Sequence, residues 1–161
     1  MSRAPEFERK ISPAAELQAR VAQLRRPIVF TNGVFDVLHR GHVTYLARSR
    51  ALGASLIVGV NSDGSVKRLG KGDDRPVNAL ADRMAVLAAL ESVSLVTSFD
   101  EDTPLALILA CRPDVLVKGG DWQPVNIVGA LEVRGWGGTV HSIPFEHDRS
   151  TTALLERIRR T

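Results

Sequence analysis

Two histidines, His39 and His42, lie three residues apart where an apolar run, residues 27–30, is followed by a helix-forming segment. Residues three apart on a helix share one face, with Cβ atoms about 5–6 Å apart, so both imidazoles can hold neighbouring oxygens of one phosphate chain. Gly41 between them removes a side chain that would separate a ligand from the backbone. The free N–H groups and positive dipole end of the first helical turn also favour an anion. In this context the pair predicts a site for a departing pyrophosphate, whereas an isolated His-x-x-His is more often a surface helix cap.

Further polar residues follow the other predicted strands. Asp36 comes after the first strand, Asn61 and Asp63 after the second, residues 118–121 after the fourth, and residues 149–152 after the fifth. Because the carboxyl ends of parallel strands meet at one edge of a sheet, where such folds bind ligands, we expect these residues to line one cleft.

Taken alone, several of these residues have two interpretations. Lys118 ends an apolar strand before two glycines, so its ammonium could contact a phosphate or could simply end a solvated strand. The hydroxyls of residues 150–152 could cradle a phosphate or cap a helix. Asp36 could cap the turn that follows it or orient a sugar hydroxyl or a magnesium-bound water, and we favour the second.

The charged residues beyond these positions have an ordinary interpretation as solvated side chains. The loop at residues 71–76 is polar and glycine-rich, and Asp73 and Asp74 partly oppose the charge of Lys71 and Arg75. Arg83, on the next predicted helix, is expected in a surface salt bridge.

The elements that must position these residues alternate between strand and helix patterns after one N-terminal helix. Ser12 is its expected cap, and Leu17, Val21 and Leu24 have helical spacing. The expected strands cover residues 28–30, 56–60, 93–96, 115–117 and 139–143, and the expected helices cover 41–52, 80–90, 104–110, 127–133 and 151–159. This order predicts an α/β fold, a single Rossmann-like domain with a parallel five-stranded sheet and helices on both faces. We divide the chain into an N-terminal extension with one helix, residues 1–25, and a catalytic domain, residues 26–161.

Composition restricts the class of protein further. The chain has 161 residues and a net charge of +3, and its basic residues are scattered, which fits a polyphosphate cleft as well as nucleic acid. No nucleic-acid motif, membrane-length apolar run or secretion signal is visible, so we expect a cytoplasmic protein that binds neither nucleic acid nor membrane. Cys111 is the single cysteine, which excludes an internal disulfide and predicts a small buried side chain.

Residues 32–42, Asn-Gly-Val-Phe-Asp-Val-Leu-His-Arg-Gly-His, resemble the signature of the HxGH nucleotidyltransferase superfamily, which is cytidylyltransferase-like. The resemblance then narrows to the adenylyltransferase half of the bifunctional heptose enzymes, and it covers residues 26–160. The segments that match in order and spacing are residues 57–63, 75–78, 100–104, 113–122 and 150–152. Val-Lys-Gly-Gly-Asp, within residues 113–122, is more specific than the histidine motif.

This resemblance implies transfer of AMP from ATP to D-glycero-β-D-manno-heptose 1-phosphate, which gives ADP-heptose and pyrophosphate for lipopolysaccharide core biosynthesis. Mg²⁺ is expected mainly on the ATP phosphates, with no certain protein ligand. The alternative within the enzyme class is a cytidylyltransferase acting on a polyol phosphate such as glycerol 3-phosphate. A non-catalytic module that binds nucleotides or nucleic acid is the alternative from another class.

The resemblance also implies roles for individual residues. The expected catalytic residues are His39, His42 and Lys118. Nucleotide and phosphate binding is expected from Asn32, Gly33, Val34, Phe35, Gly41, Lys71, Arg75, Arg149, Ser150, Thr151 and Thr152. Sugar-phosphate binding is expected from Asp36, Asn61, Asp63, Gly119, Gly120 and Asp121. Family members often have Gly-Cys where this chain has Asp148-Arg149, and Arg149 would add a cation. Related enzymes are commonly homodimers, so we expect a homodimer, and because the chain has no room for a kinase domain, a separate heptose kinase must supply the sugar phosphate.

Overall fold

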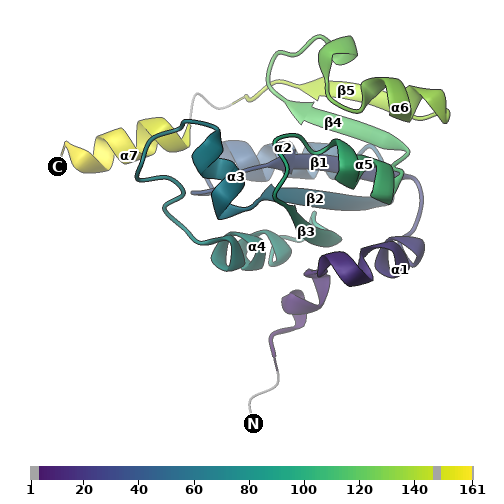
Figure 1. The fold of residues 1–161 in the computed structure, drawn as a ribbon, viewed down its shortest axis with the longest axis horizontal. Helices are drawn as coiled ribbons and strands as arrows, with labels where there is room; N and C mark the ends of the chain where they lie inside the picture. The colour runs from purple at the N-terminus through teal and green to yellow at the C-terminus, as the bar shows by residue number, and fades with distance from the viewer. Residues whose placement is uncertain (1–3, 147–149, 161) are drawn as a thin grey trace.

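A five-stranded parallel sheet forms the centre of the molecule in the computed structural model, which describes residues 4–146 and 150–160 (Figure 1). The strand order is β3-β2-β1-β4-β5, so the chain winds from β1 first toward one edge and then toward the other. The predicted α/β fold is therefore confirmed. The strands are β1 (Ile28–Gly33), β2 (Ser55–Asn61), β3 (Leu95–Phe99), β4 (Val115–Gly119) and β5 (Thr139–Ile143).

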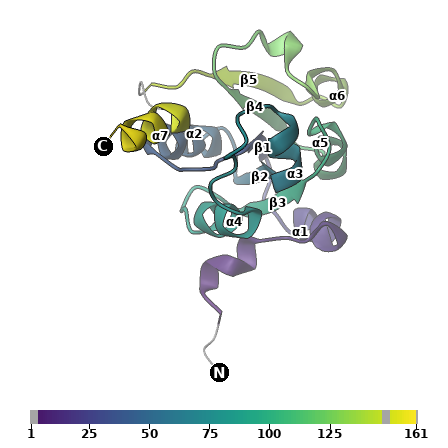
Figure 2. The same cartoon turned by 60° about the vertical axis from the view of Figure 1, so that its left-hand side comes forward.

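Helices cover both faces of the sheet because successive strand residues point to opposite sides. Ile28 and Phe30 of β1 belong to one core cluster, whereas Val29 between them belongs to the other. One face is covered by α1 (Leu17–Ala22), α5 (Leu105–Cys111) and α6 (Ala130–Gly135), and the other by α2 (Arg40–Arg50) and α4 (Leu80–Ala88). Figure 2 shows α2 and α4 on one side of the sheet and α5 and α6 on the other. Burial on both faces explains the apolar runs at Ile28–Phe30 of β1 and Leu56–Val60 of β2, whereas the edge strand β5 is only partly buried and carries Thr139, His141 and Ser142.

The N-terminal segment packs against this sheet. Two short 3-10 helices, η1 (Glu6–Lys10) and η2 (Ala14–Glu16), precede α1. Ile11 forms a parallel bridge with Val96 of β3, and the Ser12 amide donates to the Val96 carbonyl at 2.8 Å. Leu17 and Val21 of α1 are buried in the core. The segment therefore shields the β3 edge, which would otherwise present unpaired backbone groups.

Most predicted elements are present, with shifted ends and three additions, of which η1 is described above. Helix α3 (Asp63–Arg68) was not predicted, and the 3-10 helix η3 (Pro124–Asn126) delays the start of α6 from residue 127 to Ala130. The last helix, α7 (Thr151–Arg159), agrees with the prediction. Cys111 is buried, as expected. No helix in the described part of the chain is long and apolar enough to span a membrane.

Candidate active site

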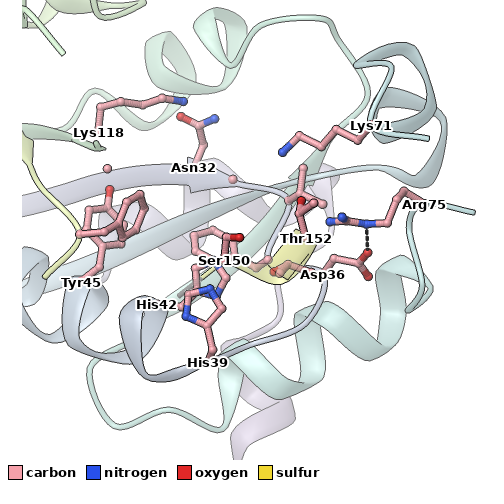
Figure 3. A pocket seen from close by; sticks show the side chains of 16 residues that line it. Asn32, Asp36, His39, His42, Tyr45, Lys71, Arg75, Lys118, Ser150 and Thr152 are labelled. Carbon is pink, nitrogen blue, oxygen red and sulfur yellow. Dashed lines mark hydrogen bonds and ion pairs between the residues drawn. The ribbon is translucent and has the colours of Figure 1, made fainter. Parts of the chain in front are cut away.

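A cavity of about 450 Å³ opens at the carboxyl ends of β1 and β4 (Figure 3). The direction of winding reverses between these two strands, and open α/β sheets bind ligands at such a point. The cavity brings together most of the predicted site residues. They are Asn32, Gly33, Val34, Phe35, Asp36, His39, His42, Lys71, Arg75, Lys118, Gly119, Ser150, Thr151 and Thr152.

The cavity forms because β1 and β4 stop pairing well before their carboxyl ends. Their ladder has two residue pairs, whereas the ladder between β1 and β2 has six. Tyr45 of α2 occupies the gap beyond the shorter ladder: its hydroxyl hydrogen-bonds with the Thr31 hydroxyl of β1 and lies 3.5 Å from the Val117 carbonyl oxygen of β4. Burial raises the pKa of Tyr45 to about 12. Tyr45 therefore stays a neutral hydrogen-bonding wedge between the diverging strands.

His39 begins α2 and faces His42 within the cavity. It is the N-cap residue, and its Nδ1 accepts a hydrogen bond from the Gly41 amide at 3.1 Å. A neutral imidazole that accepts at Nδ1 carries its proton on Nε2, so Nε2 is a donor. The two rings are stacked, with centroids 3.9 Å apart. His39 therefore fits both interpretations of the histidine pair given above, a helix cap and a ligand site, because it caps α2 and lines the cavity.

His42 lies deeper, against aromatic rings. Phe35 and Phe145 meet it edge-on at centroid distances of 5.5 and 6.4 Å. Burial, together with the charges of His39 and Lys71, lowers the pKa of His42 to about 4. Within the described residues its Nδ1 has no hydrogen-bond partner. At neutral pH this imidazole is therefore uncharged, so it can offer a ligand a hydrogen bond and no charge.

Among the described residues, two lysines supply positive charge to the cavity in addition to Arg75, which is paired with Asp36. Lys118 at the end of β4 and Lys71 from the opposite side point toward each other, with Asn32 between them (Figure 3). Burial lowers the pKa of Lys118, and the charge of Lys71 lowers it further. Burial also lowers the pKa of Lys71, as does Arg75, whereas Asp36 opposes the shift. Such a pair of facing cations favours a ligand with several negative charges.

Asp36 fixes the loop that carries Lys71. Its carboxylate accepts from Arg75 Nε at 2.6 Å and from the amides of Val77 and Asn78, both at 2.9 Å. Burial would raise the pKa of Asp36, but the two amides and the Arg75 guanidinium outweigh it, and the net shift is downward. Both oxygens are thus engaged by residues 71–78, here called the lysine segment. This role differs from the contact with a sugar hydroxyl or magnesium-bound water that the sequence suggested.

The start of α7 closes the cavity on a further side. Ser150 is a helix cap, because its hydroxyl accepts from the Ala153 amide at 3.0 Å. The Thr151 hydroxyl donates to the Val37 carbonyl at 3.1 Å, which joins α7 to the turn before α2. Ser150 therefore follows the capping interpretation and still lines the cavity, together with Thr151 and Thr152. The preceding Arg149 lies outside the described residues.

The model of one family, described as cytidylyltransferase-like, matches residues 30–157 of this chain. The chain belongs to that family. This confirms the resemblance drawn from residues 32–42. The cytidylyltransferase-like domain covers β1 to α7 and so includes every described wall of the cavity.

Two similar proteins refine the relationship. The chain is 59% identical over 155 residues to a D-beta-D-heptose 1-phosphate adenylyltransferase of Bordetella bronchiseptica, with 95% of this chain and 96% of that protein covered. It is 56% identical over 149 residues to the bifunctional protein HldE of Citrobacter koseri, of which it spans 31%, while 91% of this chain is covered.

Solved structures support the same fold. A lipopolysaccharide core biosynthesis protein from Thermoplasma volcanium aligns with a TM-score of 0.61 and 27% identity, covering 76% of this chain and 98% of that one. Pantothenate synthetase from Thermus thermophilus aligns with a TM-score of 0.59 and 19% identity, covering 84% of this chain and 61% of that one, and this likeness concerns the fold alone.

Five predicted residues of this cytidylyltransferase-like chain do not line the cavity. Gly41 is buried in the first turn of α2. Asn61 is buried and donates to the Ser65 hydroxyl at 3.0 Å. The other residues that do not line it are Asp63, Gly120 and Asp121. The expectation that residues after β2 share the cleft is wrong, because β2 lies away from the switch point and α3 follows directly at its carboxyl end.

Three residues around the site were missed or misplaced from the sequence. Tyr45 and Phe145 line the cavity and were not considered. Arg83 is not in a surface salt bridge, since its side chain is 0% exposed. Helical spacing could have found two of these: Tyr45 follows His42 by three residues, and Arg83 precedes the core residue Leu87 by four.

Proposed function

We propose that this cytidylyltransferase-like protein transfers AMP from ATP to D-glycero-β-D-manno-heptose 1-phosphate, forming ADP-heptose and releasing pyrophosphate for lipopolysaccharide core biosynthesis. The supporting observation is a cavity at the β1–β4 switch point, lined by two stacked histidines and two facing lysines. It occurs in a chain 59% identical to a protein named as a heptose 1-phosphate adenylyltransferase.

The reaction is an in-line displacement at phosphorus. An oxygen of the sugar 1-phosphate attacks the α-phosphorus of ATP, a new P–O bond forms, and the bond to the β-phosphate oxygen breaks. Because the nucleophile is already an anion, no general base is required. The protein has to align two polyanions, and such alignment can lower the activation free energy by on the order of 7–11 kcal/mol. It also has to stabilise charge on the leaving group, where one hydrogen-bond donor lowers the activation free energy by about 3–4 kcal/mol.

The residues of the cavity divide this work. The N–H groups of His39 and His42 hold oxygens of the departing pyrophosphate. Lys71 and Lys118 neutralise the phosphates from two sides, and the start of α7 contributes backbone N–H groups. These contacts strengthen as negative charge moves onto the leaving group, which is the condition for lowering the barrier.

Magnesium fits this site as a partner of ATP rather than of the protein. Among the described residues, no group of three His, Cys, Asp or Glu side chains converges to hold a metal ion. The cavity carboxylate, Asp36, already accepts three hydrogen bonds. Mg²⁺ bound to the phosphate oxygens of ATP would neutralise their charge. The homodimer and the separate heptose kinase stay predictions of the family resemblance, and the cytoplasmic location stays a prediction from the sequence.

The test is to incubate the protein with ATP, Mg²⁺ and a panel of sugar 1-phosphates and to measure pyrophosphate. A second arm uses CTP with glycerol 3-phosphate, and pyrophosphate release there alone would favour the cytidylyltransferase alternative. His42→Ala should lower turnover by about two to three orders of magnitude. His141→Ala is the control, because His141 lies on β5 outside the cavity lining. Undiminished turnover in folded His42→Ala would remove the histidines from the mechanism.

A further inference from the structure

We infer that Arg83 is a positioning residue that joins the two phosphate-facing walls of the cavity. One wall is the histidine turn, residues 34–42, and the other is the lysine segment, residues 71–78. The inference rests on the proposed function in one respect, that ATP binds in this cavity.

Arg83 reaches three separate parts of the chain from within α4. Its Nη1 donates to the Val34 carbonyl at 2.7 Å, its Nε to the Asn78 carbonyl at 3.0 Å, and its Nη2 to Asp63 at 2.8 Å. The Arg83 side chain is 0% exposed and its bond to the Val34 carbonyl is buried, whereas its partner Asp63 is 45% exposed. A buried guanidinium with a single carboxylate partner is therefore held by backbone carbonyls from both walls.

The bond to Val34 acts on the histidine turn. The next residue, Phe35, has a φ of 49°, a left-handed conformation that residues other than glycine adopt infrequently. That backbone turn places the Phe35 ring edge-on against His42. By holding the Val34 carbonyl, Arg83 fixes the start of the turn whose end carries the histidines.

The bond to Asn78 acts on the lysine segment. Asn78 also donates from its amide to the Asp36 carboxylate at 2.9 Å and from its side chain to the Asp36 carbonyl at 2.7 Å. The end of the lysine segment is thus tied to the histidine turn directly, through Asp36, and indirectly, through Arg83. Lys71 at the other end of the segment lines the cavity. A displaced segment would move the Lys71 ammonium relative to the histidines.

Arginine is the side chain that suits this position. Its planar guanidinium carries five donor hydrogens that point in fixed, different directions, whereas a lysine ammonium is a single point that cannot reach three separated acceptors. Arg83→Lys therefore keeps the charge and removes the bridge between the walls.

The experiment compares Arg83→Lys with Arg20→Lys. Arg20 is a matched control in the N-terminal segment: it donates to the carbonyls of Arg9 and Ile11 at 2.9 and 2.8 Å and pairs with Glu16. ATP affinity is measured by calorimetry with Mg²⁺ present, and turnover is measured at a temperature where circular dichroism shows each variant folded. We expect Arg83→Lys to weaken ATP binding and lower kcat/KM by about tenfold or more. Arg20→Lys should stay within about twofold.

A double variant separates positioning from general stability. If Arg83 acts by holding the lysine segment, part of its contribution to ATP binding is made through Lys71. Lys71→Met alone should therefore remove that part. The combined loss in ATP affinity of Arg83→Lys with Lys71→Met should then be smaller than the product of the two single losses. The inference would be overturned if the double variant lost ATP affinity by the full product of the two single losses. Wild-type ATP affinity in folded Arg83→Lys would also overturn it.

Two further controls complete the test. If Arg83→Lys does not fold, Asp63→Asn weakens one of the three Arg83 partners and should reduce ATP affinity by about threefold. Unchanged affinity in that variant would also overturn the inference. Wild-type protein that fails to bind ATP refutes the proposed function instead, whereas wild-type protein that binds ATP and shows no effect of either variant refutes the role of Arg83 alone.

Discussion

Acidification should destabilise the protein through His42 before it affects the buried carboxylate of the site. The pKa of His42 is lowered to about 4 by burial and by the charges of His39 and Lys71, whereas an unfolded histidine has a pKa of about 6.5. Between these values the unfolded chain takes up a proton at residue 42 that the folded protein does not. Stability is therefore greatest above about pH 6.5 and is lost progressively as the pH falls toward 4.

The size of the loss follows from the two pKa values. At pH 5 the unfolded histidine is almost fully protonated and the folded one is largely neutral, which corresponds to about 2 kcal/mol relative to pH 8. Because the His42 ring is only partly buried, solvent screening reduces this to about 1 kcal/mol. The Asp36 carboxyl does not contribute in this window: its pKa is lowered, so its stabilisation is lost only below the ordinary range of an aspartate.

The assay is urea unfolding at pH 8, 6.5 and 5 for the wild type and for His42→Asn, which cannot titrate. Groups other than His42 are shared by the two proteins, so the difference between their pH dependences isolates this residue. Turnover is a poorer probe, because phosphate esters of substrates titrate near pH 6 themselves. An equal loss of unfolding free energy in both proteins between pH 8 and pH 5 would refute a neutral, desolvated His42.

Three other substitutions test the packing around the site, and a labelling experiment tests the core at Cys111. Tyr45→Phe removes the hydroxyl between β1 and β4 and should cost about 1–2 kcal/mol in urea unfolding, and a cost near zero would contradict its role as a wedge. Gly119→Ala should cost about 1 kcal/mol, because its Cβ would lie 2.6 Å from Cζ of Phe145. Adding Phe145→Leu to Gly119→Ala should recover the lost unfolding free energy if the Phe145 ring is its cause. Burial raises the pKa of the Cys111 thiol to about 12, so a thiol reagent should label Cys111 only after unfolding, and rapid labelling of the native protein would show otherwise.

The alternation of strands and helices could be predicted because each element carries its own local signal. Continuous apolar runs indicated the strands, and apolar residues at helical spacing indicated the longer helices. Helix α3 gave no such signal, since Val66 is its single buried apolar residue. The bridge between Ile11 and Val96 joins segments far apart in the sequence, so no local pattern reveals that the N-terminal segment covers the sheet edge.

The site was predictable where it depends on the ends of strands and unpredictable where it depends on their order. The residues at the end of β1 and the last two residues of β4 line the cavity, because these strands flank the switch point, whereas Gly120 and Asp121 beyond β4 do not. Asn61 ends β2 in the same way, but only the strand order tells that β2 lies one position away from the switch. Arg83 was predicted to be solvent-exposed because it is charged. It lies four residues before Leu87, however, so the two side chains share the buried face of α4.

Under the proposed function, two kinds of contact recognise the polyphosphate: charge from the lysines and directed hydrogen bonds from His42. Lys71 and Lys118 carry net charge, which attracts an anion at a distance but discriminates weakly between substrate and product. A neutral His42 instead offers a hydrogen bond whose value rises as charge develops on the leaving oxygens. A third cation in its place would bind ATP and pyrophosphate alike, and uniform binding of this kind lowers KM without accelerating transfer. The proposed mechanism therefore depends on the aromatic rings of Phe35 and Phe145 around His42 as much as on the imidazole itself.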